Sequence, residues 1–386
     1  MPTPMRRSKP TSATASPGNS VQPKTLLVIT NGIGEDSVGA ELVRRLPSSI
    51  KASAYPTLGS GAYYDGVCEI VGPRATLASA GSRVAQGTIA KDMRGGLLAT
   101  VPPGLAFMHR ARHAYDRVLV IGDFIGVGGC FLTGIRNVTY VDVYKTGYSR
   151  PYLGIERWVI KQTCRTVFSR HPSLAESLKA DGVDARAVGN VMMDTIPRSD
   201  LDVASLRTRP LAVTLLPGSR DLTAANFGLM VEALRRVPAE LEPDVFLALA
   251  GGVDPEELAQ VAGLTWTGLG FTGDLTVHAA RGALGNFVEN SDVVLSQAGT
   301  ATIQSLGLGR PVITFVRPGD RMKRHLDENR LFGDARLLVP DDANEIANVL
   351  TRLLRDDADR ARRGAIGRER IGGPGAIDKI IETLAS

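Results

Sequence analysis

The chain has 386 residues, of which 43% are hydrophobic and 22% charged, which is ordinary for a globular protein and long enough for two domains. No apolar run reaches the roughly 20 residues that span a bilayer, and the three scattered cysteines, Cys68, Cys130 and Cys164, are too few for a disulfide framework or a zinc cluster and fit a reducing compartment. A net charge of +5 is compatible with nucleic acid, an anionic membrane surface or a phosphorylated substrate, and of these we expect no nucleic acid.

Residues 1–23 form a basic segment rich in Pro, Ser and Thr. It contains Arg6, Arg7 and Lys9, and the first acid of the chain is Glu35. This composition predicts a disordered tail. An organelle transit peptide is also basic, Ser-rich and acid-poor, so import stays open, whereas the apolar core of a secretory signal is missing. We therefore expect a cytoplasmic protein, with peripheral membrane association and organelle import as alternatives.

Apolar strands alternate with amphipathic helices over residues 24–196, which predicts a parallel sheet covered on both faces. The expected strands are Lys24–Thr30, Arg117–Ile121, Val138–Val143 and Thr166–Phe168, and the expected helices are Ser37–Leu46, Glu156–Thr163 and Ser173–Asp181. The composition then turns polar between Asp194 and Pro210, which predicts an interdomain linker. We place the domain boundary between residues 196 and 197.

The segment Leu97–Arg112 mixes apolar residues with His109, Arg110 and Arg112, and Arg94 precedes it. It predicts either a surface that contacts an anionic membrane or a lipid acceptor, or a core helix with a basic solvent face. His109 and His113 are one helical turn apart, as metal ligands can be, but the arginines between them oppose a cation, and we expect no metal site.

The same alternation restarts over residues 197–386. The expected strands are Leu211–Leu216, Val245–Ala250, Leu269–Phe271, Val293–Leu295 and Pro311–Phe315, and the expected helices are Phe227–Arg236, Pro255–Ala262, Thr302–Leu308, Ala343–Leu354 and Ile377–Leu384. The sequence therefore predicts an α/β protein with two Rossmann-like, doubly wound parallel-sheet domains that face a central cleft. The last helix is a candidate to pack back on the N-terminal domain.

Two loops of the second domain have the pattern of an anion site, because small residues follow a buried strand and precede a helix. The first contains Gly218, Ser219 and Arg220, whose guanidinium suits a diphosphate. The second contains Gly299, Thr300, Ala301 and Thr302, with backbone amides and hydroxyls that could ligate phosphate. Gln304 follows in the first helical turn, where it either reaches a ribose or faces solvent.

Polar residues follow two expected strands of the first domain. Asn31, Gly32 and Gly34 form a turn that carries Glu35 and Asp36, which either cap the next helix or line the cleft as catalytic acids. Asp123 follows the strand Arg117–Ile121, at the edge where open α/β sheets bind ligands. It is either a general base or a buried acid bonded to loop amides.

These motifs together resemble the lipid A disaccharide synthases, and more closely the branch described as lipid-A-disaccharide-synthase-related proteins. The resemblance rests on an ordered set that spans nearly the whole chain: NGIGEDSVGAEL (31–42), IGDF (121–124), GNVMMD (189–194), LLPGSR (215–220) and AGTATIQSLGLGRPV (298–312). It implies an inverting GT-B glycosyltransferase that needs no cofactor, with a lipid acceptor on the N-terminal domain and a UDP-sugar on the C-terminal one.

Carried over to this chain, the resemblance makes Asp123 the general base, gives the diphosphate to Arg220 and the 299–302 loop, and gives the ribose to Gln304. Two positions depart from the family pattern: Ile33 stands where the related branch often has His, and Gln304 stands where sugar-nucleotide transferases usually have an acid. These departures leave a non-catalytic membrane-surface binding protein open, and a UDP-sugar epimerase of the same fold is a further alternative. The oligomeric state is also open.

Overall fold

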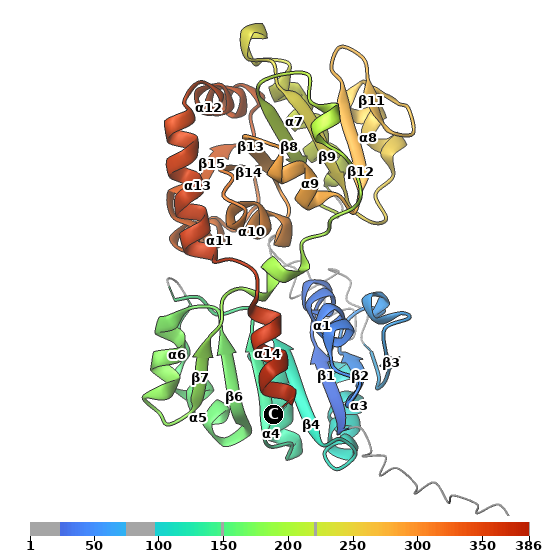
Figure 1. Cartoon of the computed structure of the whole chain (residues 1–386), viewed down its shortest axis with the longest axis vertical. Helices are drawn as coiled ribbons and strands as arrows, with labels where there is room; N and C mark the ends of the chain where they lie inside the picture. The colour runs from blue at the N-terminus through green and yellow to red at the C-terminus, as the bar shows by residue number, and fades with distance from the viewer. Residues whose placement is uncertain (1–23, 75–96, 148–149, 220–221, 386) are drawn as a thin grey trace, which may run out of the picture.

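The protein is described by a computed structural model that covers residues 24–74, 97–147, 150–219 and 222–385. The basic tail and Arg220 lie outside the described residues. Two sheets, one in each half of the chain, form two α/β domains stacked along the long axis of the molecule (Figure 1). The predicted fold class is confirmed.

The N-terminal sheet is parallel throughout, with the strand order β3-β2-β1-β4-β5-β6-β7. Its strands are β1 (Lys24–Thr30), β2 (Ile50–Pro56), β3 (Glu69–Ile70), β4 (Arg117–Gly122), β5 (Val138–Asp142), β6 (Cys164–Ser169) and β7 (Asp184–Ala187). Its helices are α1 (Ile33–Arg45), α3 (Leu97–Ala111), α4 (Phe124–Thr133), α5 (Gly154–Thr163) and α6 (Pro172–Lys179).

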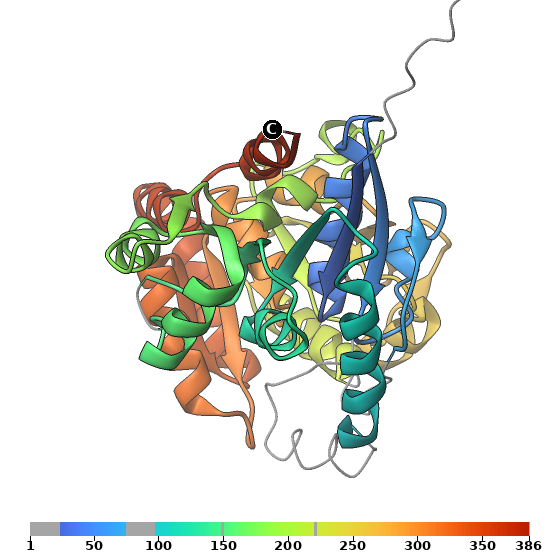
Figure 2. The ribbon, with the colours of Figure 1, turned by 90° about the horizontal axis from the view of Figure 1, so that it is seen from below.

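Strand β1 explains why this sheet is covered on both faces. Its central residues are all apolar, and successive side chains of a strand point to opposite faces. Leu27 and Ile29 pack into a buried cluster with α3, α4, α5 and α6, whereas Leu26 and Val28 pack into another cluster with α1 and the last helix, α14 (Ala376–Ala385). Figure 2 shows α14 and α3 on opposite sides of the sheet.

The C-terminal sheet has the strand order β10-β11-β12-β9-β8-β13-β14-β15, and it is parallel except at β10 and β11. Its strands are β8 (Ala212–Leu216), β9 (Asp244–Leu249), β10 (Thr265–Trp266), β11 (Gly270–Thr272), β12 (Val277–Arg281), β13 (Val293–Ser296), β14 (Val312–Val316) and β15 (Arg336–Pro340). Its helices are α7 (Thr223–Leu234), α8 (Pro255–Ala262), α9 (Leu284–Glu289), α10 (Thr300–Gly307), α11 (Met322–Phe332), α12 (Ala343–Arg355) and α13 (Asp357–Ile371).

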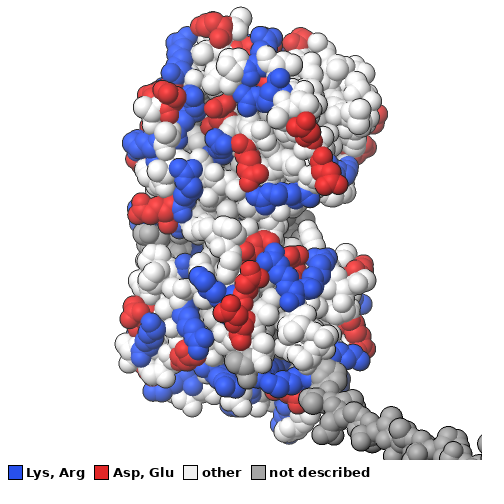
Figure 3. Space-filling model, in the orientation of Figure 1, with Lys and Arg blue, Asp and Glu red and all other residues white. Residues whose placement is uncertain are grey.

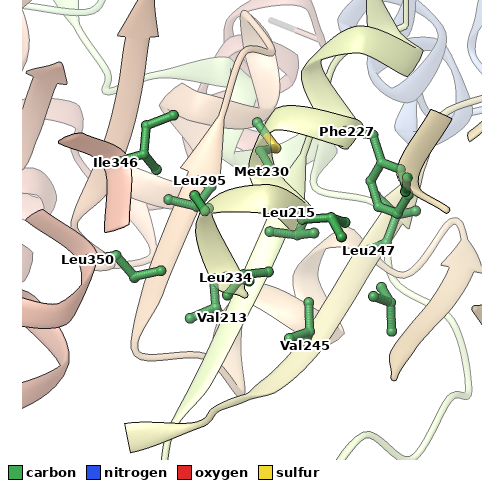
Figure 4. Close-up of a cluster of buried hydrophobic side chains, with 14 of the residues drawn as sticks. Val213, Leu215, Phe227, Met230, Leu234, Val245, Leu247, Leu295, Ile346 and Leu350 are labelled. Atoms are coloured by element: carbon green, nitrogen blue, oxygen red, sulfur yellow. The ribbon is translucent and has the colours of Figure 1, made fainter. Parts of the chain in front are cut away.

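Helix α7 illustrates how this domain is held together. Phe227, Met230 and Leu234 share one face of the helix and are buried against β8, β9 and β13, while Ile346 and Leu350 of α12 cover the same face of the sheet (Figure 4). Each such side chain contributes roughly 1.5–3 kcal/mol when it is fully buried. This core fixes the edge of the sheet from which the predicted anion loops emerge.

The chain crosses between the domains twice. A short 3-10 turn, Val191–Thr195, leads out of the first domain, and α14 returns to it after the second. Asp194 joins these crossings, because its two carboxylate oxygens accept the backbone N–H groups of Gly375 and Ile377, at 2.5 and 2.9 Å. The GNVMMD motif therefore helps to anchor α14 on the N-terminal domain.

Helix α3 buries Met108 and Ala111 in the core and exposes His109 and Arg110, and Arg112 just after its end is also exposed, as expected of a core helix with a basic solvent face. The guanidinium of Arg112 lies between the imidazoles of His109 and His113, at 3.3 and 2.9 Å, where a metal would have to bind. Within the described ranges, no group of three or more His, Cys, Asp or Glu side chains could hold a metal ion. No helix in these ranges is long and apolar enough to span a membrane.

Candidate active site

The two predicted anion loops lie side by side. Strands β8 and β13 are parallel neighbours with Leu216 opposite Ser296, and the N–H of Gln297 donates to the Leu216 carbonyl at 2.9 Å. Gly218 has φ +104°, a conformation that favours glycine, and a Cβ there would lie 3.8 Å from the Gln297 carbonyl. Gly218 and Ser219 therefore stand beside the second loop, as the sequence predicts.

The second loop is held in shape by hydroxyl groups. The Thr302 hydroxyl donates to the Ala298 carbonyl at 2.6 Å and lies 2.7 Å from the Ser296 hydroxyl, which in turn accepts the Ala298 N–H at 3.2 Å. Thr302 is buried, so its side chain shapes the loop and does not face the cleft. Only its backbone N–H is left for the predicted role in phosphate binding.

Helix α10 begins at Thr300, two residues earlier than the sequence predicts, and its N-cap is Gly299. No side chain caps this end, and the first turn contains no acid. The first N–H groups of a helix have no partner within it, so those of Thr300 and Ala301 point out of the helix end, where the dipole favours an anion. A Cβ on Gly299 would meet no atom within 4 Å, so this end is also sterically open.

Gln304 faces the interdomain linker. Its side chain is only 3% exposed, and its Nε2 donates to the Met192 carbonyl at 2.8 Å. Sequence reasoning placed this amide either on a ribose or in solvent, and the structure gives it a structural role between α10 and the Val191–Thr195 turn. The buried side chain is therefore not available to a ribose.

Asn31 and Asp123 meet at the facing edge of the N-terminal sheet. They follow the neighbouring strands β1 and β4, and the Asn31 Nδ2 donates to Asp123 Oδ1 at 2.5 Å. The same oxygen accepts the Ile125 N–H at 2.9 Å, so Asp123 is also the N-cap of α4. A Cβ on Gly122 would lie 2.0 Å from Asn31 Oδ1, so the glycine of the IGDF motif makes room for this pair.

Asp36 lies deeper in the N-terminal domain. The carboxyl is 3% exposed and accepts a hydrogen bond from the Thr30 hydroxyl at 2.5 Å, while the Tyr64 hydroxyl donates to Thr30 at 3.4 Å. Burial raises the pKa of Asp36 to about 6, an increase that the Thr30 hydrogen bond opposes and the charge of Glu35 supports. The geometry therefore places Asp36 in the support of the cleft edge, behind the surface that a substrate could reach.

Residues 33–36 of the Asn31–Asp36 motif lie in the first turn of helix α1, which begins at Ile33 with Gly32 as its N-cap. The Glu35 carboxylate folds back over Gly32, where a Cβ would lie 2.3 Å from its Oε2. A Cβ on Gly34 would lie 3.3 Å from the Thr300 hydroxyl, so the start of α1 meets the start of α10 across the domain boundary. Figure 3 shows the surface hollowed between the two lobes.

Basic side chains that sequence reasoning missed line the seam between the domains. Arg170 and His171 follow β6, and Arg370 lies on α13 of the other domain. Burial lowers the pKa of the Arg170 guanidinium to about 10, and the charge of the nearby Asp142 opposes this decrease. Burial also lowers the pKa of His171, and the positive charges of Arg370 and Arg170 lower it further. No local motif marks these residues, because the fold alone brings them together.

Comparison with known sequences gives a partial match. No family model matches the chain. It is 30% identical over 216 residues to a lipid-A-disaccharide synthase of Azotobacter vinelandii, a match that covers 53% of this chain and 54% of the relative. The chain therefore spans about half the length of the curated relative that it matches.

Solved structures of similar fold cover almost the whole chain. A Listeria monocytogenes structure described as a UDP-N-acetylglucosamine 2-epimerase superposes with a TM-score of 0.60 at 16% identity, and the match covers 94% of this chain and 96% of that one. A UDP-glucosyltransferase from Polygonum tinctorium superposes with a TM-score of 0.57 at 13% identity and covers 95% and 99%. The chain thus has the GT-B fold, which both kinds of enzyme share.

Proposed function

We propose that this protein is an inverting glycosyltransferase that moves a sugar from a UDP-sugar to a lipid or lipid-like acceptor. The observation that carries the proposal is the contact between the starts of α1 and α10 across the domain boundary, because the two sides of this contact have unlike surroundings. On the C-terminal side, α10 presents uncapped backbone N–H groups beside the Gly218 loop. On the N-terminal side, Asp123 stands at the carboxyl edge of β4 and accepts a hydrogen bond from Asn31, which lies just before the start of α1. A diphosphate donor needs hydrogen-bond donors for its negative charge, and a hydroxyl acceptor needs a base that takes its proton.

The donor belongs to the C-terminal side. The N–H groups of Thr300 and Ala301 and the dipole of α10 would stabilise the charge that develops on the departing UDP. Arg220, which lies outside the described residues, would add a cation by the family resemblance. The similarity to proteins named for UDP-sugars and for lipid A disaccharide synthesis supports this choice of donor and acceptor.

The reaction would proceed by direct displacement. The acceptor hydroxyl attacks the anomeric carbon, the bond from that carbon to the UDP oxygen breaks, and Asp123 takes the hydroxyl proton. The two donors on Asp123 Oδ1, from Asn31 and Ile125, would hold the carboxylate in one orientation, which a general base requires.

Donor identity can be tested first, by thermal-shift measurements with a panel of nucleotide sugars. We expect one UDP-sugar to raise the unfolding temperature more than UDP itself, since binding to the folded state alone stabilises it. Transfer is then measured with that donor, radiolabelled in the sugar, and membrane lipid extracts, and label should move into the organic phase. No shift with any nucleotide sugar would contradict the proposal and favour a non-catalytic binding protein.

An epimerase is the second candidate, because the Listeria monocytogenes fold matches over nearly the whole chain. Incubation with UDP-N-acetylglucosamine alone separates the two activities. A glycosyltransferase leaves the donor sugar unchanged without an acceptor, whereas an epimerase converts it.

A further inference from the structure

An apolar surface on the N-terminal domain has no part in the site described above. It consists of Ile125 and Leu132 on α4 and of Leu153, Ile155 and Trp158 at the start of α5, and we name it the α4–α5 patch. Each of these five side chains is between 50% and 73% exposed. Clustered exposed hydrophobic side chains typically mark an interaction surface, whereas isolated ones are normal.

The two helices that carry the patch are joined by an aromatic contact. The sequence of α4, FIGVGGCFLT, contains no charged residue, and Val127 and Cys130 take its buried face. Ile125 and Leu132 are seven residues apart and therefore share the opposite face. The ring of Phe131 contacts that of Trp158 edge to face, with centroids 5.3 Å apart, and this contact joins α4 to α5.

The start of α5 is fixed from inside, so its apolar side chains are held outward. The Glu156 carboxylate accepts the Leu153 N–H at 2.7 Å and forms a salt bridge with Lys145 at 2.6 Å, and both charged side chains are largely buried. This arrangement stabilises the first turn of α5 with Leu153 and Ile155 on its outer side. The exposure of the patch is thus part of the folded structure.

The charges around the patch are cationic. Residues 124–165 contain six basic side chains and two acids, and of the six, Lys145 pairs with Glu156 and Arg157 pairs with Asp181, which follows α6. Both acids are used internally: Glu156 pairs with Lys145, and Asp142 is buried and accepts hydrogen bonds from Tyr144, Lys145 and Tyr152. At the rim, Arg136 lies over the Phe131 ring at 5.2 Å, and Lys161 is exposed one turn after Trp158.

We propose that the α4–α5 patch docks on an anionic lipid bilayer. Aliphatic side chains with a tryptophan and a cationic rim are the composition of surfaces that lie in the headgroup region. A second copy of the chain would bring two cationic rims face to face, which opposes self-association through this patch. The role of this docking rests on the proposed function. Ile125 is two residues from Asp123, so a docked bilayer would present a lipid acceptor to the cleft edge.

Vesicle co-sedimentation of the full chain tests the docking. We expect binding to phosphatidylcholine vesicles that contain phosphatidylglycerol and much weaker binding to phosphatidylcholine alone. Leu132→Ser and Ile155→Ser should each weaken binding roughly tenfold, because each removes one aliphatic side chain from the membrane. Leu269→Ser is the matched control, since Leu269 is 83% exposed on the other domain, and it should bind like the unaltered chain.

Fluorescence gives a second readout that does not depend on folding differences between variants. The chain has two tryptophans, so Trp266→Phe leaves Trp158 as the sole reporter. Its emission should shift to the blue on adding anionic vesicles, as the indole enters the headgroup region. The proposal would be overturned if the emission of Trp158 did not shift or if the chain sedimented with neither kind of vesicle. It would also be overturned if sedimentation equilibrium showed a dimer that Leu132→Ser dissociates. UDP binding measured on the same samples separates this failure from failure of the proposed function.

Discussion

The two edges that face each other across the domain boundary are built from the same elements and differ in how their helices begin. In the N-terminal domain, α4 is capped by the Asp123 side chain and α1 carries Glu35 and Asp36 in its first turn. In the C-terminal domain, neither α7 nor α10 has a side-chain cap or an acid in the first turn. Where carboxylates occupy the helix starts an anion is repelled, and where the starts are left open an anion is attracted. One fold used twice thus supplies a proton acceptor on one side and a diphosphate site on the other.

The largest expected effect on turnover comes from removing the general base, Asp123. Asp123→Asn should lower turnover by roughly 10²–10⁴-fold, the usual contribution of a general base. Asparagine is as good an N-cap as aspartate and can still accept from Asn31 and Ile125, so the fold should be kept. Steady-state kinetics and the unfolding temperature check both parts. Retained turnover would remove Asp123 from the mechanism.

The pH dependence of the folding stability separates the structural role proposed for Asp36 from the catalytic role proposed for Asp123. Its pKa is raised from 3.8 to about 6 in the folded state, so the folded protein holds this proton more tightly than the unfolded chain. The stabilisation is complete below the unfolded pKa and is lost as the pH rises through about 6, which amounts to on the order of 3 kcal/mol.

Asp36→Asn should therefore flatten the change of unfolding free energy between pH 4 and 6, which denaturant titrations measure. Its amide oxygen can still accept from Thr30, so activity at neutral pH should change little. A loss of turnover as large as that of Asp123→Asn would instead make Asp36 a catalytic acid.

The proposed anion site at the uncapped start of α10 can be tested by adding a negative charge there. Gly299→Asp adds a carboxylate at the N-cap of α10, where it favours the helix but repels a diphosphate, and UDP affinity should fall roughly 10–100-fold. Gly154→Asp makes the same substitution at the first residue of α5, where a Cβ also meets no atom within 4 Å. Calorimetry should show unchanged UDP binding for this control.

The smallest expected effect concerns the orientation of Asp123. Asn31→Ala removes one of the two donors to Asp123 Oδ1, and turnover should fall about tenfold, the size of one such hydrogen bond to a charged group. The Michaelis constant for the donor should hold, because Asn31 lies on the acceptor side. An effect on donor binding alone would place Asn31 in the wrong half of the site.

Sequence reasoning succeeded where the signal is local. The strand Lys24–Thr30 is bounded correctly because an unbroken apolar run ends at Asn-Gly, and Gly218 and Gly299 follow the buried strands β8 and β13 as their apolar runs predict. It placed the starts of α1 and α10 too late, since glycine N-caps leave no side-chain signal. It missed β2, whose small residues lack a clear apolar pattern, and α13, whose 15 residues are mostly charged or small.

The candidate site was predictable only in part. Asp123 could be found from its place after a strand, but its hydrogen bond to Asn31 joins residues 92 positions apart and needs the order of strands in the sheet. Gln304 looked like a ligand residue from its place in the first helical turn, and its partner, the Met192 carbonyl, lies 112 positions away. Which polar groups face a cleft and which join two domains is decided by tertiary contacts that local patterns do not encode.

The central claim is that the C-terminal edge binds the diphosphate and the N-terminal edge supplies the proton acceptor. It is tested most directly by titrating UDP into the Gly299→Asp and Asp123→Asn variants in one calorimetric series. The account predicts that Gly299→Asp loses affinity for UDP and that Asp123→Asn binds UDP like the unaltered protein. Equal losses in both variants, or a loss in Asp123→Asn alone, would contradict it.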